Sequence, residues 1–262
     1  MWNDKNDLLK YCLNLEGKRI KDVASRSNLA QLRKQQVEVK NGQRKYVQKQ
    51  LINDIIEQDC FNTPKNNSPD PDLKLKNGDE WELKVSHTFV AGNGWITPEY
   101  RLVLKMLDYH DIAKHPNWKN SGLYKKLNQM VVVYYHKEQN TLEEDYKIIC
   151  ARLFESKTYH SRIVKDYAIM RTHVNNGIVI SEKNHSFLAN CPKHSGGFNR
   201  QNPGSSPSQT LSSHPNILHA EKRGYCIKKD GNCEIFTDLL GIKMHRSGRY
   251  YGAMVSDIQH LP

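Results

Sequence analysis

The feature that most limits the fold is an apolar run near the middle of the chain. Residues 129–137 read QMVVVYYHK, and β-branched or aromatic residues follow Met130 without a polar interruption. A run of this length between polar ends is typical of a buried strand. Residues 101–107 and 144–154 predict further strands, and residues 160–174 predict a helix. Strands separated by helices predict a mixed α/β (α+β) sheet flanked by helices.

The N-terminal part of the chain has the spacing of helices. Apolar residues recur at helical intervals in residues 5–33, and a single glycine divides them into two predicted helices. Residues 46–58 predict an amphipathic helix that carries Glu57 near its end. Between these helices, Asn41-Gly42 favours a hairpin, and Glu38 is expected in a strand.

The C-terminal part is less regular. Residues 177–191 predict a strand hairpin, and residues 223–261 predict strands with one short helix. Between them, residues 194–220 consist mainly of Gly, Ser, Pro, Asn and Gln. This composition is typical of a long loop or a flexible segment.

The charge of the chain points to a polyanionic partner. Its 262 residues carry a formal net charge of +11, and the most common partner of so basic a protein is nucleic acid. No apolar run approaches the ~20 residues of a membrane helix, and the N-terminus does not resemble a signal peptide. We therefore expect a cytoplasmic protein.

The six cysteines show no framework of regular spacings, so we expect them to be reduced thiols. A zinc site is the alternative, with Cys191, His194, Cys226 and Cys233 as ligands. Zinc ribbons repeat tight two-residue spacings, and this set does not, which makes the structural metal the less favoured interpretation.

The stretch 68-SPDPDLKLKNGDEWELKVS-86 carries the strongest chemical signal. Residues two apart in a strand point the same way, so Glu82 and Lys84 share one face while Trp81 and Leu83 pack on the other. An aspartate lies in the turn just upstream. Carboxylates bind divalent metals, and a neighbouring lysine can orient water or neutralise developing charge, as phosphodiester hydrolysis requires.

Spacing alone leaves alternatives to this interpretation. Two more Glu-x-Lys pairs occur, at Glu16-Gly17-Lys18 and at Glu38-Val39-Lys40. The first lies in a helical region, and the second has only a distant upstream acid. The pair Glu82-Leu83-Lys84 could also be an exposed ion pair on the solvated face of a sheet.

The quoted stretch resembles the active-site segment of the MutH and Sau-type GATC endonuclease family, a branch of the PD-(D/E)xK nucleases. In that family an acid-Asp turn precedes a Val-Glu-Leu-Lys strand. Residues 8–29 are similar to the opening helices of the family, and residues 52–61 to the helix that donates an acid. Residues 101–112 and 121–137 are close to segments of the Sau-type restriction branch. The likeness covers most of residues 5–242 and is weakest at 194–220.

The resemblance implies a restriction-endonuclease-like fold in which two lobes clamp DNA, with a catalytic lobe of about residues 1–145 and a recognition lobe of about 146–262. It implies that Asp72, Glu82 and the backbone carbonyl of Leu83 bind Mg²⁺, with Mn²⁺ able to substitute. Asp70 competes with Asp72 for the ligand role.

Further roles follow from the same resemblance. Lys84 would orient or activate water, Glu57 would support the metal or the lysine, and Lys126 would contact the scissile phosphate, with Lys125 as the alternative. The expected DNA contacts are Lys193, Arg223, Tyr225, Lys228 and Lys229. Two family positions differ here, because Cys191 replaces an arginine and Cys226 replaces an aromatic residue.

The resulting hypothesis is a Mg²⁺-dependent type II restriction endonuclease that cuts double-stranded DNA at GATC or a related site. It would act in a bacterial cytoplasm near the nucleoid, be paired in function with a DNA methyltransferase, and be a monomer or a DNA-induced dimer. Alternatives are a mismatch-repair nicking enzyme, one domain of a larger allosteric enzyme, and a non-catalytic protein that uses residues 20–29 as a helix-turn-helix reader.

Overall fold

The computed structural model describes residues 2–40, 49–63, 70–138, 141–176, 185–192, 223–248 and 250–259. The chain divides into two compact units that are interleaved in sequence. The first comprises Met1–Tyr100, Gln129–Phe154 and Cys233–Pro262, and the second comprises Arg101–Asn128 and Glu155–Asn232.

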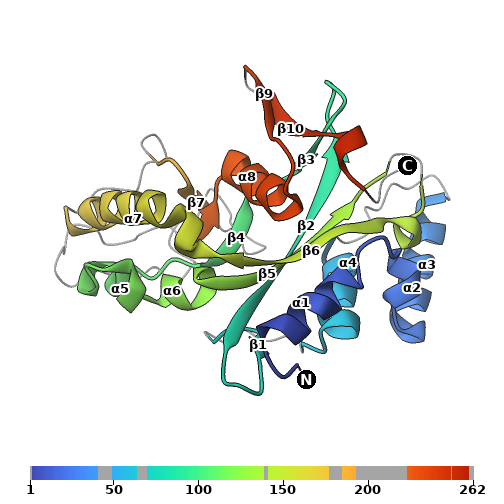
Figure 1. The fold of residues 1–262 in the computed structure, drawn as a ribbon, viewed down its shortest axis with the longest axis horizontal. Coiled ribbons are helices and arrows are strands. Elements are labelled where there is room, and N and C mark those ends of the chain that lie inside the picture. The colour runs from blue at the N-terminus through green and yellow to red at the C-terminus, as the bar shows by residue number, and fades with distance from the viewer. Residues whose placement is uncertain are drawn as a thin grey trace, which may run out of the picture. The chain divides into compact units, whose positions relative to one another are not determined.

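A seven-stranded mixed sheet among the described residues forms the centre of the first unit. The strands follow one another in space as β6-β5-β2-β3-β10-β9, and β1 pairs with β2 outside this order. Their bounds are β1 Leu73–Lys74, β2 Glu80–Val90, β3 Trp95–Pro98, β5 Gln129–His136, β6 Lys147–Glu155, β9 His245–Ser247 and β10 Tyr250–Met254. Figure 1 shows β2 running from β1 at one end to β3 at the other.

The predicted buried strand is confirmed as β5, in which every residue from Met130 to His136 is buried. It lies parallel to β2, with Glu82 opposite Met130 and Lys84 opposite Val132. A parallel pair inside a sheet is buried on both faces, which explains why the β5 sequence has no polar alternation.

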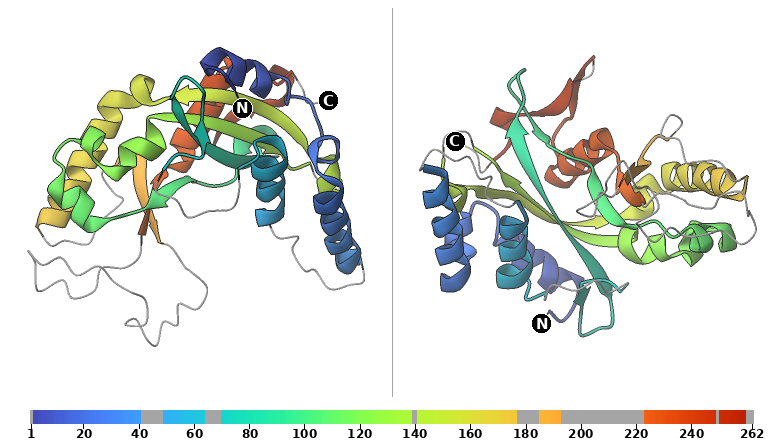
Figure 2. Two further views of the ribbon diagram at one scale, coloured as in Figure 1. Left: turned by 90° about the horizontal axis from the view of Figure 1, so that it is seen from below. Right: turned by 180° about the vertical axis from the view of Figure 1, so that it is seen from behind.

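Helices cover one face of this sheet. They are α1 Lys5–Leu13, α2 Ile20–Val23, α3 Arg26–Lys40 and α4 Lys49–Ile55, which continues into the π-helix η1 Ile56–Cys60. Their apolar residues pack with Trp81, Leu83, Val131 and Val133 in one core. Figures 1 and 2 show these helices, in blue, gathered beside one another. On the opposite face, Tyr134 meets Phe236 of α8 (Lys229–Leu240), with ring centroids 5.0 Å apart.

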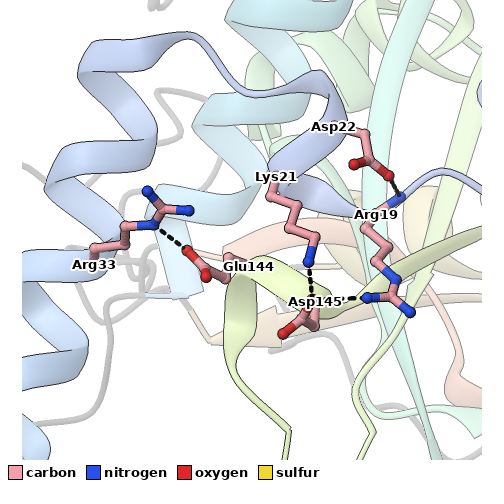
Figure 3. Close-up of polar contacts among 6 residues, drawn as sticks. All are labelled: Arg19, Lys21, Asp22, Arg33, Glu144 and Asp145. Atoms are coloured by element: carbon pink, nitrogen blue, oxygen red, sulfur yellow. Dashed lines mark hydrogen bonds and ion pairs between the residues drawn. The ribbon is translucent and has the colours of Figure 1, made fainter.

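Ion pairs fasten the N-terminal helices to the sheet (Figure 3). The short helix η3, Glu143–Asp145, leads into β6. Asp145 accepts from Lys21 at 2.8 Å and from Arg19 at 3.1 Å, and this pairing, above all the bond from Lys21, lowers the pKa of Asp145. Arg33 of α3 contacts Glu144 at 2.6 Å. Acidic partners therefore neutralise part of the basic charge of α2 and α3.

The second unit contains a three-stranded antiparallel sheet in the order β4-β8-β7. Its elements are β4 Leu102–Met106, α5 Tyr109–Lys114, η2 Trp118–Asn120, α6 Gly122–Leu127, η4 Ser156–Tyr159, α7 His160–Asn175, β7 Leu188–Pro192 and β8 Arg223–Ile227. The fully buried carboxylate of Asp166 in α7 accepts from the backbone N–H groups of Ser186, Phe187 and Leu188. Three such bonds compensate the cost of burying the charge and fix the start of β7.

The structure confirms the mixed α/β fold class and corrects several sequence predictions. Residues 5–33 hold three helices instead of two. Glu38, which was expected in a strand, lies in α3, and the predicted Asn41-Gly42 hairpin falls on residues 41–48, outside the described part. The short C-terminal helix is the 12-residue α8. Residues 177–184 and 194–220 also lie outside the described part. No helix in the described residues is long and apolar enough to cross a membrane.

Candidate functional site

Strand β2 carries the Glu-x-Lys pair into the interior of the first unit. The Glu82 carboxylate is 2% exposed, and its Oε1 lies 2.5 Å from Nζ of Lys84. The alternation of β2 puts both side chains on the face opposite Trp81 and Leu83. Burying a carboxylate is costly unless a cation or hydrogen bonds compensate it. Glu82 is therefore not part of an exposed surface ion pair, which was the alternative interpretation of its spacing.

Asp72 reaches the same strand from the turn before β1. Leu73 pairs with Trp81, so the register brings Asp72 beside Glu82 and Leu83. The N–H of Leu83 donates to Oδ2 of Asp72 at 3.0 Å. In an extended strand the N–H and C=O of one residue face the same edge, so the Leu83 carbonyl is turned toward Asp72 and away from β5. Asp70, the competing acid, is exposed two residues upstream.

Glu57 comes to this cluster on the π-helix η1, which packs on β2. The N–H and the hydroxyl of Thr63 both donate to the Glu57 carbonyl, at 2.9 and 2.6 Å, and hold the end of this turn. Desolvation raises the pKa of Glu57, the Lys84 ammonium lowers it, and the Asp72, Asp54 and Glu82 carboxylates raise it. Three acids and one ammonium thus act on Glu57 electrostatically.

Asp54 is a member of the cluster that the sequence analysis missed. It lies one turn before Glu57 in α4, and its side chain is only 6% exposed. It acts on the Glu57 carboxyl as a further negative charge. Asp54 interrupts the apolar run LINDII with a charged residue. This interruption is the only feature of the sequence that points to a role for Asp54.

The predicted phosphate-contacting lysine belongs to the second unit. Lys126, in the last turn of α6, is 6% exposed, whereas Lys125 beside it is exposed. Lys126 is therefore the lysine of this pair that the fold encloses. Burial of an ammonium has a high free-energy cost, so an enclosed lysine is typical of a position with a specific role.

The predicted DNA contacts of the second unit differ in accessibility. Tyr225 is completely buried in β8, which removes its side chain from contact with DNA in this conformation. Nζ of Lys228 donates to the His185 carbonyl at 3.1 Å, and Lys229 is half-buried at the start of α8. Lys193 and the side chain of Arg223 lie outside the described part.

The donor set of the cluster fits a hard divalent cation. Asp72 and Glu82 offer carboxylate oxygens, and Leu83 offers a carbonyl at the same edge of β2. Mg²⁺ is commonly bound by one or two carboxylates and takes its remaining ligands from water and phosphate. Within the described residues, no three acidic, histidine or cysteine side chains by themselves form a metal-holding group.

Comparison with known proteins gives one family. The model of the family described as DNA mismatch repair enzyme MutH matches residues 61–166. This segment contains Asp72, Glu82, Lys84 and Lys126, and Glu57 lies just before it. Compared with curated protein sequences, the chain gives no significant match.

Proposed function

Residues 61–166 of this chain belong to the MutH family, and from this premise we propose that the protein is a Mg²⁺-dependent endonuclease that cuts double-stranded DNA at a short site, GATC or a related sequence. The observation that carries the proposal is that Asp72 and Lys84 meet the buried carboxylate of Glu82 on β2. A solvated sheet face would not bury such a group.

Each side chain has a defined part in this proposal. Asp72, Glu82 and the Leu83 carbonyl would hold Mg²⁺, which acts as a Lewis acid on the phosphate and lowers the pKa of water. Lys84, held by Glu82, would orient the attacking water and neutralise charge that develops on the phosphate. Glu57 would support the metal or the ammonium of Lys84, and Lys126 would contact the scissile phosphate. Mn²⁺, which accepts the same oxygen ligands, should substitute for Mg²⁺.

The restriction role is the finer part of the proposal. It rests on the similarity of residues 101–112 and 121–137 to the Sau-type restriction branch, and on the net charge of +11, which suits a phosphate backbone. In this role the enzyme acts in the cytoplasm, alongside a methyltransferase that protects the host DNA. A repair-type nicking enzyme is the alternative within the family.

The helix-turn-helix alternative finds less support. Its first helix, α2, has four residues, and the N-terminal turn of α3 is bound to Asp59 of η1. The Asp59 carboxylate accepts from the N–H of Ser25 at 2.8 Å and from the side chain of Asn28 at 2.9 Å. A reader presents the N-terminal turn of its second helix to base edges, and here that turn faces protein.

The test uses Asp72→Asn, which keeps an oxygen that can accept from Leu83 but removes the charge. Wild-type protein should cut unmethylated plasmid into discrete fragments with Mg²⁺ and should not cut with EDTA. The variant should be slower by about a hundredfold or more, because a Lewis acid is worth several kcal/mol and about 1.4 kcal/mol is tenfold in rate.

Asp70→Asn is the matched control, since it removes one charge from an exposed position of the same turn. It should cut at the wild-type rate. If both asparagine variants cut normally, the metal-binding assignment fails. Binding of DNA without cleavage by the wild type under all metal conditions would favour the non-catalytic alternative. Loss of cleavage on adenine-methylated plasmid would support GATC as the site.

A further inference from the structure

The hairpin β9–β10 lies beyond the part of the chain that resembles the family and has an unusual composition. Residues 241–256 contain Lys243, Arg246 and Arg249, one histidine, two tyrosines and no acidic residue. A short segment with only positive charge and exposed aromatic residues is typical of a nucleic-acid contact.

The structure presents Arg246, Tyr250 and Tyr251 at the edge of the sheet, and Lys243 lies just before β9. Tyr250 pairs with Ser247 and Tyr251 with Arg246. The guanidinium of Arg246 lies 6.0 Å from the centre of the Tyr251 ring, which is a cation–π geometry. Arg246 and Lys243 are exposed, and the Tyr250 side chain is 46% exposed.

The hairpin is fixed to the sheet that carries the candidate catalytic residues. Strand β10 pairs with β3 through Ala253 and Ile96, and the rings of His245 and Trp95 lie 5.7 Å apart. A Cβ atom at Gly252 would come within 2.6 Å of the Ile96 carbonyl oxygen, so glycine allows the two backbones to approach this closely. The basic edge therefore has a defined position relative to β2.

That position is remote from the catalytic residues along the same strand. Val90, where β2 meets β3, is eight residues beyond Glu82. At about 3.3 Å per residue the separation is about 26 Å along β2. Because a duplex rises about 3.4 Å per base pair, this distance corresponds to about eight base pairs. A contact there would fall outside a four-base-pair site.

We propose that the β9–β10 hairpin is a second DNA contact, which binds the phosphate backbone of the duplex flanking the cleavage site. This inference rests on the proposed endonuclease function. Arg246 and Lys243 would pair with phosphates, and the Tyr250 hydroxyl would donate a hydrogen bond to a phosphate oxygen. Such contacts are independent of sequence, so they raise affinity for long DNA without changing the site that is read.

The test compares duplexes of 10 and 30 base pairs, each centred on the site found by plasmid digestion. Binding is measured by fluorescence anisotropy at several salt concentrations with Ca²⁺, an ion with the same preference for oxygen ligands as Mg²⁺. The wild type should bind the long duplex more tightly and with a steeper salt dependence. In Arg246→Ala, this slope should fall by about 0.9, the value for one phosphate contact. Affinity for the short duplex should not change.

Lys10→Ala is the matched control, because it removes one positive charge from an exposed position on α1. It should keep the length and salt dependence of the wild type. If Arg246→Ala and the double variant Lys243→Ala/Arg246→Ala both do so as well, the hairpin inference is wrong while the endonuclease remains. If the wild type neither binds nor cuts either duplex, the endonuclease proposal itself fails, and the hairpin inference fails with it.

Discussion

At the scale of single residues, the fold partly shields the charged side chains of the candidate site from solvent. That Glu82 and Lys84 share one face could be predicted from the apolar alternation and strand geometry, whereas Asp72 was preferred to Asp70 because of the family resemblance. Asp54 could not be predicted, since helix spacing shows only that one face of α4 is apolar. Whether an acid on that face is buried depends on which elements cover it, and the local sequence does not contain this information.

The buried acids should cost folding stability, and Glu57 offers a test. Burial raises its pKa above the ordinary 4.5, so the charged form is disfavoured in the folded state. The cost is absent well below pH 4.5 and grows as the pH rises through the unfolded and then the folded pKa. Glu57→Gln should therefore be more stable than wild type at pH 7 and equal to it near pH 3.5.

Urea unfolding at both pH values, followed by circular dichroism, measures this difference. The same variant should cut DNA more slowly by about 10- to 100-fold, the usual effect of losing a group that supports a metal site. Equal unfolding midpoints for the two proteins at pH 7 would mean that the Glu57 carboxyl is not desolvated.

At the scale of elements, β2 links the features that matter for function. Its first half carries Glu82 and Lys84. Its end pairs with β3, and β3 in turn pairs with β10. The existence of β2, β5 and α7 followed from the sequence because each has a strong period of its own. The pairing of β2 with β5 and the π-turn at Glu57 did not, because contacts between distant segments decide both.

The close approach of β10 to β3 gives a prediction at this scale. In Gly252→Ala the new methyl group would overlap the backbone of Ile96 and the Cβ of Trp95, and neither can swing away as a flexible side chain does. We expect a loss of about 1–3 kcal/mol in the free energy of unfolding, as for other overpacked positions.

Gly92→Ala is the control for this substitution. Gly92 lies in the turn between β2 and β3, and a Cβ there would meet no atom within 4 Å. Its effect should stay within about 0.5 kcal/mol, which is usual for a surface substitution. Equal unfolding midpoints for both variants would show that β10 can move away from β3 without loss of stability.

At the scale of the whole molecule, the two units are interleaved in sequence, and local sequence patterns could not predict this arrangement. Residues 233–262 return to the first unit after the chain has built the second, so the C-terminal segment completes the sheet that begins near residue 73. The family resemblance implied a catalytic lobe of about residues 1–145 and a recognition lobe of about residues 146–262. Contacts between distant segments bring the C-terminal part of the chain back to the first unit, and no local sequence pattern indicates this return.

The proposal assigns one catalytic group, Asp72, Glu82 and Lys84, to each chain, and this makes a prediction about how two strands are cut. One chain should cleave one strand at each encounter. At protein concentrations well below that of supercoiled plasmid, we expect nicked circles to appear first and linear DNA to follow, with the lag becoming shorter as protein is added. Agarose gels sampled over time measure both species. Linear DNA without a nicked intermediate at any concentration would indicate a dimer formed in advance, and nicked circles as the final product would favour the repair-type enzyme over the restriction enzyme.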